Sequence, residues 1–199
     1  MLPEIVLSKI NKSFNSKKVL TNFSYSFKFN SIYKVSGQNG SGKTTLLKII
    51  KGIYLPDSGL VQSNFRLTGN ISYIDNNPRS FFHRLNVSDN LEYFLSLNDS
   101  SYQPSIVEEL MDFFEILGFK ETLFSDLSQG QMQLVSIIRG LANKSKVIIF
   151  DESFSFLDAQ NKSKLQSLII DRQIKEQNLI LFCSHDDIFS KSNFTELKL

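Results

Sequence analysis

The sequence has 199 residues, 41% of them hydrophobic and 21% charged, a composition typical of a globular chain that can bury a full core. Its longest unbroken apolar run, Leu179 to Cys183, is far shorter than the roughly 18 residues of a membrane span, and Met1 to Ile10 lacks the features of a secretory signal. A cytosolic location is therefore expected. The single cysteine excludes an internal disulfide, and the two histidines argue against structural zinc. The net charge of +2 argues against a dedicated nucleic-acid surface.

The first third of the chain is predicted to form strands and one helix. Ile5 to Ile10 and Phe23 to Phe29 are short and rich in β-compatible residues, and the polar stretch Asn11 to Lys18 predicts the turn of an antiparallel pair. Ile32 to Ser36 predicts a third strand. This strand continues through a glycine-rich loop into a helix over Lys43 to Gly52.

The rest of the chain is predicted to alternate between helix and strand. After a turn at residues 56–59, two short strands are expected near Leu60 to Phe65 and Ile71 to Ile74, and the apolar spacing over residues 86–124 predicts two or three helices. The later elements are a helix over Gln129 to Ala142, a strand over Lys146 to Phe150, a helix over Ala159 to Glu176, a strand over Leu179 to Cys183 and a strand over Phe194 to Leu199. This alternation favours an α/β fold with helices on both faces of a parallel sheet.

The loop between the third strand and the first helix matches a phosphate-binding pattern. Residues 37–44 read G-Q-N-G-S-G-K-T, which is Gly, four residues, Gly, Lys and then Ser or Thr. Glycines let successive backbone N–H groups turn toward phosphate oxygens, and the following helix adds its N-terminal dipole. In such a loop Lys43 reaches the β and γ phosphates of a nucleotide, and the Thr44 hydroxyl is a ligand of Mg²⁺.

Two carboxylates follow the buried strand that ends at Phe150. Asp151 suits a Mg²⁺ partner acting through water, and Glu152 suits a base that polarises an attacking water. Strand ends are also often acidic simply because they reach solvent.

Two other polar residues each have a purely structural interpretation. Ser128 is well placed as the N-cap of a helix. His185 follows an apolar strand, where a histidine is more often structural than catalytic.

Together these features resemble the ATP-binding cassette (ABC) ATPases in motif identity, order and spacing, over essentially the whole chain. Residues 37–45 resemble the Walker A motif, 127–131 the LSGGQ signature, 148–152 Walker B, 155–158 the D-loop and 184–186 the switch histidine. The resemblance implies one ABC ATPase domain over residues 1–199. Its α/β P-loop NTPase (RecA-like) core would span residues 1–76 and 128–199, with an N-terminal antiparallel β subdomain, and a helical ABC-specific insertion would span 77–127.

The resemblance also implies the roles of individual residues. The ATP-binding residues would be Phe14, Gly37, Gln38, Asn39, Gly40, Ser41, Gly42, Lys43, Thr44, Thr45, Asn76, Ser128, Gln129, Gly130, Gln131 and Asp158. Thr44, Asn76 and Asp151 would serve Mg²⁺, and Glu152 and His185 would be catalytic. Phe14 would stack on adenine through its aromatic face, and a phenylalanine buried at a strand end is an equally weighted alternative.

Three positions depart from the family pattern. Asn76 stands where the family has a Gln that contacts Mg²⁺ and water, and its amide is one methylene shorter, which makes a bridging water plausible. Gln129 replaces the first of two signature glycines, whereas Gly130, which lets the backbone approach the γ-phosphate, is kept. Ser153 replaces the proline that usually follows the catalytic Glu, and we expect this to loosen the turn.

The resemblance implies a head-to-tail dimer in which the Walker A motif of one subunit and the signature of the other close on each ATP. A symmetric homodimer is the economical inference, and a heterodimer is the alternative. The partner in transport would be a separate transmembrane subunit, which places the chain on the cytoplasmic face of the membrane, with residues 81–85 in the groove that docks it. The alternative is that Phe81 and Phe82 of this stretch belong to the hydrophobic core.

The chain is expected to energise transport, and its compact form resembles small exporter-type subunits. Two other functions remain open. One is a soluble ABC ATPase that assists assembly or remodelling, for example in iron–sulfur cluster biogenesis. The other is a degenerate cassette that binds ATP without hydrolysing it, a reading suggested by Asn76 and Ser153.

Overall fold

The computed structural model describes residues 4–77, 80–97, 103–184 and 194–199. Its strands are β1 (Glu4–Phe14), β2 (Lys17–Lys28), β3 (Ser31–Ser36), β4 (Ser58–Ser63), β5 (Ile71–Asp75), β6 (Val147–Asp151), β7 (Leu179–Cys183) and β8 (Thr195–Lys198). Its helices are α1 (Lys43–Lys51), α2 (Val87–Ser96), α3 (Pro104–Phe113), α4 (Gln129–Ala142) and α5 (Ala159–Glu176), with short 3₁₀ turns η1 (Leu117–Phe119) and η2 (Phe124–Asp126). No helix among these residues is both long and apolar enough to span a membrane.

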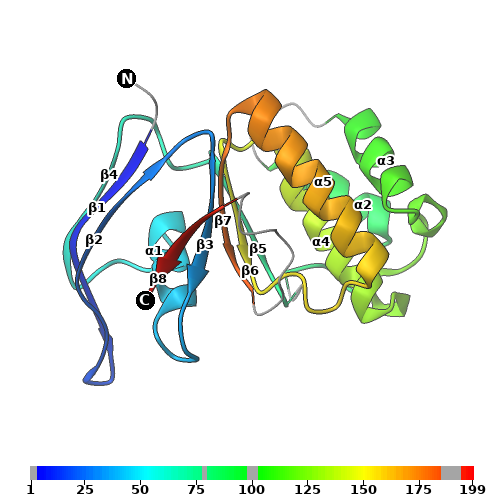
Figure 1. Cartoon of the computed structure of the whole chain (residues 1–199). Coiled ribbons are helices and arrows are strands. Elements are labelled where there is room, and N and C mark those ends of the chain that lie inside the picture. The colour runs from blue at the N-terminus through cyan, green and yellow to red at the C-terminus, as the bar shows by residue number, and fades with distance from the viewer. Residues whose placement is uncertain (1–3, 78–79, 98–102, 185–193) are drawn as a thin grey trace.

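The described strands form two sheets. A three-stranded antiparallel sheet has the order β2-β1-β4, and a five-stranded parallel sheet has the order β5-β6-β7-β3-β8. Figure 1 shows α1 between the two sheets, and α2 to α5 together on the opposite side of the parallel sheet. The chain is therefore built in layers, and the parallel sheet is covered on both faces.

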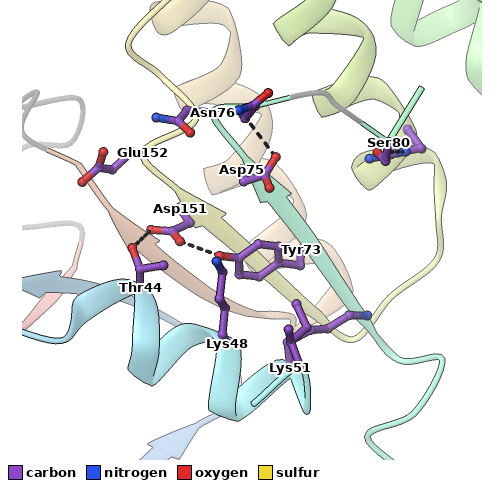
Figure 2. Close-up of a pocket in the computed structure, with 12 residues that line it drawn as sticks. Thr44, Lys48, Lys51, Tyr73, Asp75, Asn76, Ser80, Asp151 and Glu152 are labelled. Atoms are coloured by element: carbon purple, nitrogen blue, oxygen red, sulfur yellow. Dashed lines mark hydrogen bonds between the residues drawn. The ribbon is translucent and has the colours of Figure 1, made fainter. Parts of the chain in front are cut away.

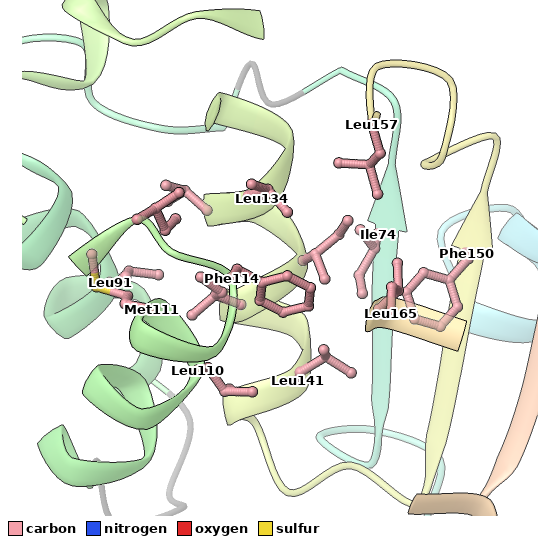
Figure 3. Close-up of a cluster of buried hydrophobic side chains, with 14 of the residues drawn as sticks. Ile74, Leu91, Leu110, Met111, Phe114, Leu134, Leu141, Phe150, Leu157 and Leu165 are labelled. Atoms are coloured by element: carbon pink, nitrogen blue, oxygen red, sulfur yellow. The ribbon is translucent and has the colours of Figure 1, made fainter. Parts of the chain in front are cut away.

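Two hydrophobic clusters fill the spaces between these layers. Ile149 of β6 belongs to the cluster with α1 and the antiparallel sheet, whereas its neighbours Ile148 and Phe150 belong to the cluster with α2 to α5, part of which is shown in Figure 3. Every residue of β6 and β7 is buried, because both faces of these central strands are covered. The short, continuous apolar runs of the sequence thus correspond to strands in the middle of the sheet.

The polar stretch Asn11 to Lys18 is not the turn that the sequence predicts. β1 and β2 continue through it, and only Asn15 and Ser16, with φ of 45° and 67°, connect them. The register shifts three times between Leu7 and Ser13, and these bulges interrupt the alternation by which a strand is recognised. The strand predicted near Leu60 to Phe65 begins and ends earlier, as β4, because its pairing with β1 already starts at Ser58, opposite Asn11.

The helical predictions are confirmed where local capping defines the helix ends. The Ser128 hydroxyl accepts a hydrogen bond from Gln131 N at 3.3 Å, and Gln131 Oε1 accepts one from Ser128 N at 2.8 Å. This capping box starts α4, and Asp158 caps α5 by accepting from Asn161 N at 2.7 Å. Helices α2 and α3 confirm the helical pattern of residues 86–124.

The packing of α4 on β5 leads to a prediction about Gly140. A Cβ atom at Gly140 would lie 2.4 Å from Ile74 Cδ1, so we expect Gly140→Ala to lower the free energy of unfolding by about 1–3 kcal/mol despite the better helix propensity of alanine. Urea unfolding followed by circular dichroism measures the change. Gly118→Ala is the control, because a Cβ atom there meets nothing within 4 Å. A more stable Gly140→Ala variant would contradict the packing argument.

Candidate functional site

The glycine-rich loop joins the end of β3 to the start of α1. Gly40 and Gly42 have φ of 82° and 103°, the left-handed region that favours glycine, and a Cβ atom on Gly42 would come within 2.9 Å of Val19 Cγ1. Gly42 is the N-cap of α1, and a glycine has no side chain that could accept hydrogen bonds from the first N–H groups of the helix. The loop therefore brings the positive end of the α1 dipole to its concave side, where an anion can bind.

The interior of the loop is lined by groups that suit a phosphate. Lys43 is buried, and its Nζ donates to Gly37 O at 2.9 Å and to Gln38 O at 3.1 Å. The buried Ser41 hydroxyl has no hydrogen-bond partner in the described part of the chain. Because a buried polar atom without a partner is costly, an entering phosphate oxygen would satisfy a group that the loop leaves unpaired.

Asp151 lies beside the first turn of α1. The Thr44 hydroxyl donates to Asp151 Oδ1 at 3.0 Å, and the Tyr73 hydroxyl donates to Asp151 Oδ2 (Figure 2). Burial and the nearby Asp151 raise the pKa of Tyr73, so its hydroxyl stays protonated and remains a donor. Thr44 directs its proton to the carboxylate, which leaves its oxygen lone pairs available to a cation. Hydroxyl and carboxylate oxygens are the ligands that Mg²⁺ prefers, so this pair fits that ion.

Glu152 occupies a constrained turn directly after β6. Its φ is 55°, and its backbone N–H donates to Cys183 O at 2.9 Å. The next side chain, Ser153, is buried and donates its hydroxyl to Ile74 O of β5 at 2.6 Å. The turn is therefore tied to β5, in contrast to the loosening expected from the loss of proline.

Two cavities meet at Thr44 and Glu152. The loop cavity, of about 640 Å³, is lined by Lys17, Val19, Asn39, Gly40, Gly42, Lys43, Thr44, Thr45 and Glu152. The carboxylate cavity, of about 780 Å³, is lined by Thr44, Lys48, Lys51, Ile53, Tyr73, Asp75, Asn76, Asn77, Ser80, Arg139, Asp151 and Glu152 (Figure 2). The structure therefore brings the phosphate-loop residues, Asn76 and the two carboxylates into one continuous region.

Charges of both signs face the carboxylate cavity. Burial lowers the pKa of Arg139 to about 10, against the opposing effect of Asp75, so the guanidinium stays charged at neutral pH. Burial also raises the pKa of Asp75, although Asn77 N and Arg139 act in the other direction. The Arg139 guanidinium donates to Ser80 Oγ at 2.9 Å. Arg139 of α4 is thus connected to the segment that follows β5.

Phe14 is at the end of β1 and is 40% exposed, so the alternative of a buried core phenylalanine is wrong. Its ring centroid lies 5.4 Å from that of Tyr54 in a T-shaped contact, and Lys12 Nζ lies 5.2 Å from the ring centroid. Asp57 accepts from Lys12 Nζ at 2.8 Å and from Ser13 N at 2.7 Å, which fixes the chain just before Phe14. The Lys12 hydrogen bond and the Ser13 N–H lower the pKa of Asp57.

The signature residues line other cavities. Ser128, Gly130, Gln131 and Asp158 line one of about 260 Å³, and Gln129 lines another of about 260 Å³ together with Asn76 and Asn77. A Cβ atom on Gly130 would lie 3.0 Å from Phe156 O. Because the signature residues line these two cavities, they do not line the loop cavity of their own chain.

Sequence reasoning missed Tyr73, Lys17 and Val19. Tyr73 lies on a strand next to the one that carries Asp151, and only the strand register reveals that they meet. Lys17 and Val19 line the loop cavity from β2; Lys17 lies within the stretch predicted to be a turn, and Val19 directly follows that stretch. His185 lies outside the described residues.

Comparisons with known proteins agree with this geometry. Residues 20–155 match the family model described as ABC transporter. The energy-coupling factor transporter ATP-binding protein EcfA of Malacoplasma penetrans is 32% identical over 181 residues, which are 84% of this chain and 62% of that protein. The probable sulfate/thiosulfate import ATP-binding protein CysA of Chlorella vulgaris is 31% identical over 191 residues, 92% of this chain and 80% of that protein.

A solved structure described as the ATP binding subunit of an ABC transporter covers 100% of this chain and 86% of its own, with a TM-score of 0.87. Its sequence identity is 19%, so it shows that the fold is shared. The order of strand, glycine loop, helix and carboxylate-bearing strand is that of a P-loop NTPase core. The chain therefore belongs to the ABC transporter family.

Proposed function

We propose that the chain binds ATP with Mg²⁺ in the loop cavity, hydrolyses it and thereby energises transport through a separate membrane subunit. The observation that carries this proposal is the 3.0 Å hydrogen bond from Thr44 to Asp151. It joins the end of the phosphate loop to the carboxylate at the end of β6, where a cation between the phosphates and the protein would be held.

The residues around this bond have complementary roles in the proposed reaction. The N–H groups at the start of α1 and the Lys43 ammonium would hold the β and γ phosphates, and Thr44 and Asp151 would hold Mg²⁺, the latter through water. Asn76 lines the carboxylate cavity together with Thr44 and Asp151 and would reach the ion through a bridging water. Bound Mg²⁺ neutralises charge on the phosphate oxygens. Glu152 would polarise the attacking water.

Residues beyond the loop complete the proposed nucleotide site. Phe14 would stack on adenine, which its exposed ring supports. His185 would hold the γ-phosphate. We assign residues 77–127 as the helical part of a single domain, with residues 1–76 and 128–199 as its α/β core.

We also propose a head-to-tail dimer of two copies of the chain. Ser128, Gln129, Gly130 and Gln131 lie away from the loop cavity of their own chain, and Ser128 and Gly130 share a cavity with Asp158. A second copy could therefore present these residues to the ATP bound by the first. This arrangement would supply each of two equivalent sites with both motifs.

The aromatic residues after Asn77 support a docking surface for the membrane subunit. Phe81 is buried, as core packing requires, but Phe82 is 43% exposed and its ring lies 5.0 Å from that of Tyr93 and 5.5 Å from that of Phe94. Leu85 is also partly exposed. A short helix of the membrane subunit would bury these side chains.

We favour an importing or energy-coupling transporter over the exporter type expected from compact size. Both relatives named above carry import or energy coupling in their names. The chain spans 62% of the length of EcfA, so its activity and partners in the cell are part of this proposal.

Affinity purification of the tagged chain tests the transport assignment. The chain is captured in parallel from detergent-solubilised membranes and from cytosol, and stoichiometric partners are identified by mass spectrometry. We expect a polytopic membrane protein in the membrane fraction, and its loss when Phe82 is replaced by Asp. Recovery of soluble partners alone, or of none, would overturn the transport role and leave the ATPase assignment standing.

A further inference from the structure

Both carboxylate oxygens of Asp151 are held by hydroxyl donors from different elements. The Thr44 hydroxyl of α1 donates to Oδ1 at 3.0 Å, and the Tyr73 hydroxyl of β5 donates to Oδ2. Asp151 is 5% exposed, so few water molecules can replace either donor. The orientation of this carboxylate therefore depends on both side chains.

The position of Tyr73 follows from the strand register. β5 and β6 are parallel, with Tyr73 opposite Ile149 and Asp75 opposite Asp151. Tyr73 packs with the cluster on the α1 side of the sheet, whereas the next residue, Ile74, packs with the cluster on the other side. Figure 2 shows the Tyr73 side chain extending from β5 toward Asp151, so that a ring anchored two residues from the strand end reaches the carboxylate.

We propose that Tyr73 is a positioning residue for the metal carboxylate, an inference that rests on the proposed role of Asp151 toward Mg²⁺. The terminal torsion of an aspartate has broad minima, so a carboxylate held at one oxygen can rotate about its Cβ–Cγ bond. The Tyr73 hydroxyl fixes Oδ2, which keeps Oδ1 on Thr44 and the Thr44 lone pairs toward the cation. Hydrogen bonds to a charged acceptor are strong enough to set this orientation.

Tyr73 also connects the metal carboxylate to the strand that leads to Asn76. A second hydrogen bond joins β5 to the turn after β6, where Ser153 Oγ donates to Ile74 O at 2.6 Å. β5 is thus linked to Asp151 by Tyr73 and to the turn after it by Ser153. Any displacement of β5 would therefore be transmitted to both the metal carboxylate and the turn that carries Glu152.

The test is the Tyr73→Phe variant, which removes the hydroxyl and keeps the ring. Binding of a fluorescent ATP analogue is titrated with Mg²⁺ and with EDTA, and binding of Mn²⁺ to the protein–nucleotide complex is followed by electron paramagnetic resonance. We expect about a tenfold loss of the Mg²⁺-dependent gain in nucleotide affinity and weaker Mn²⁺ binding, with unchanged affinity in EDTA. Neither readout requires turnover.

Tyr33→Phe is the matched control. Tyr33 is buried, whereas Tyr73 is partly buried, and the Tyr33 hydroxyl accepts a hydrogen bond from Lys28 N at 3.1 Å, away from Asp151. We expect this variant to keep the wild-type response to Mg²⁺. If Tyr73→Phe also keeps it, or loses only thermal stability, the inference is overturned and the proposed function stands. If the wild-type protein gains no affinity from Mg²⁺, the proposed metal site fails and the inference fails with it.

Discussion

The Glu152→Gln variant is expected to bind ATP with near wild-type affinity and to hydrolyse it at least about a hundredfold more slowly, because a general base contributes about 10²–10⁴-fold to rate. Gln has nearly the same shape as Glu, and the hydrogen bond from its backbone N–H to Cys183 O does not depend on the side chain. The turn should therefore persist while the group that polarises water is lost.

Two measurements check this expectation. Single-turnover phosphate release gives the rate of hydrolysis, and size-exclusion chromatography in ATP and Mg²⁺ shows the oligomeric state. If hydrolysis reopens the proposed dimer, Glu152→Gln should accumulate as a dimer with ATP bound. Glu108→Gln is the control, since Glu108 lies on α3 and its carboxylate is 3.8 Å from the ammonium of Lys120. Unchanged turnover in Glu152→Gln would refute the assignment of the base.

Replacement of Lys43 by Ala is expected to weaken nucleotide binding by about a hundredfold or more. The variant removes a buried positive charge that would meet the phosphates, and hydrogen bonds to charged groups contribute about 1.5–3 kcal/mol each. It also removes the two hydrogen bonds by which Lys43 holds Gly37 O and Gln38 O, so the loop loses part of its support.

Titration with the same fluorescent ATP analogue measures the loss, and thermal unfolding without nucleotide reports on the loop itself. Lys175→Ala is the control, because Lys175 is exposed on α5 and pairs with Asp171 at 2.7 Å. We expect the control to bind nucleotide as the wild type does. An affinity of Lys43→Ala within threefold of the wild type would contradict phosphate binding by this loop.

The parts of the fold that could be predicted are those defined by neighbouring residues. Ser128 and Asp158 start α4 and α5 through caps that lie within three residues, and the apolar run Leu179 to Cys183 is long enough to identify β7. The β1–β2 hairpin could not be delimited, because its bulges remove the alternation and its polar residues resemble a turn. An irregular strand of this kind can be recognised only once its pairing with the neighbouring strand is known.

The candidate site likewise contains residues that could be predicted from local motifs and residues that could not. Thr44 and Asp151 belong to local motifs and could each be identified from spacing, and the structure places them in contact. Tyr73 could not be identified, because its contact with Asp151 spans 78 positions and depends on the β5–β6 register. The hydrogen bond from buried Ser153 to Ile74 O could not be predicted either, because nothing in the residues around Ser153 indicates that its hydroxyl reaches a strand 79 positions earlier in the sequence.

The position of β7 between β6 and β3 determines when the site can assemble during synthesis. Until residues 179–183 are synthesised, β3, which precedes the phosphate loop, and β6, which carries Asp151, lack the strand that lies between them, and each has an unpaired edge. The emerging chain therefore keeps exposed strand edges, which favour aggregation, until this one strand is inserted.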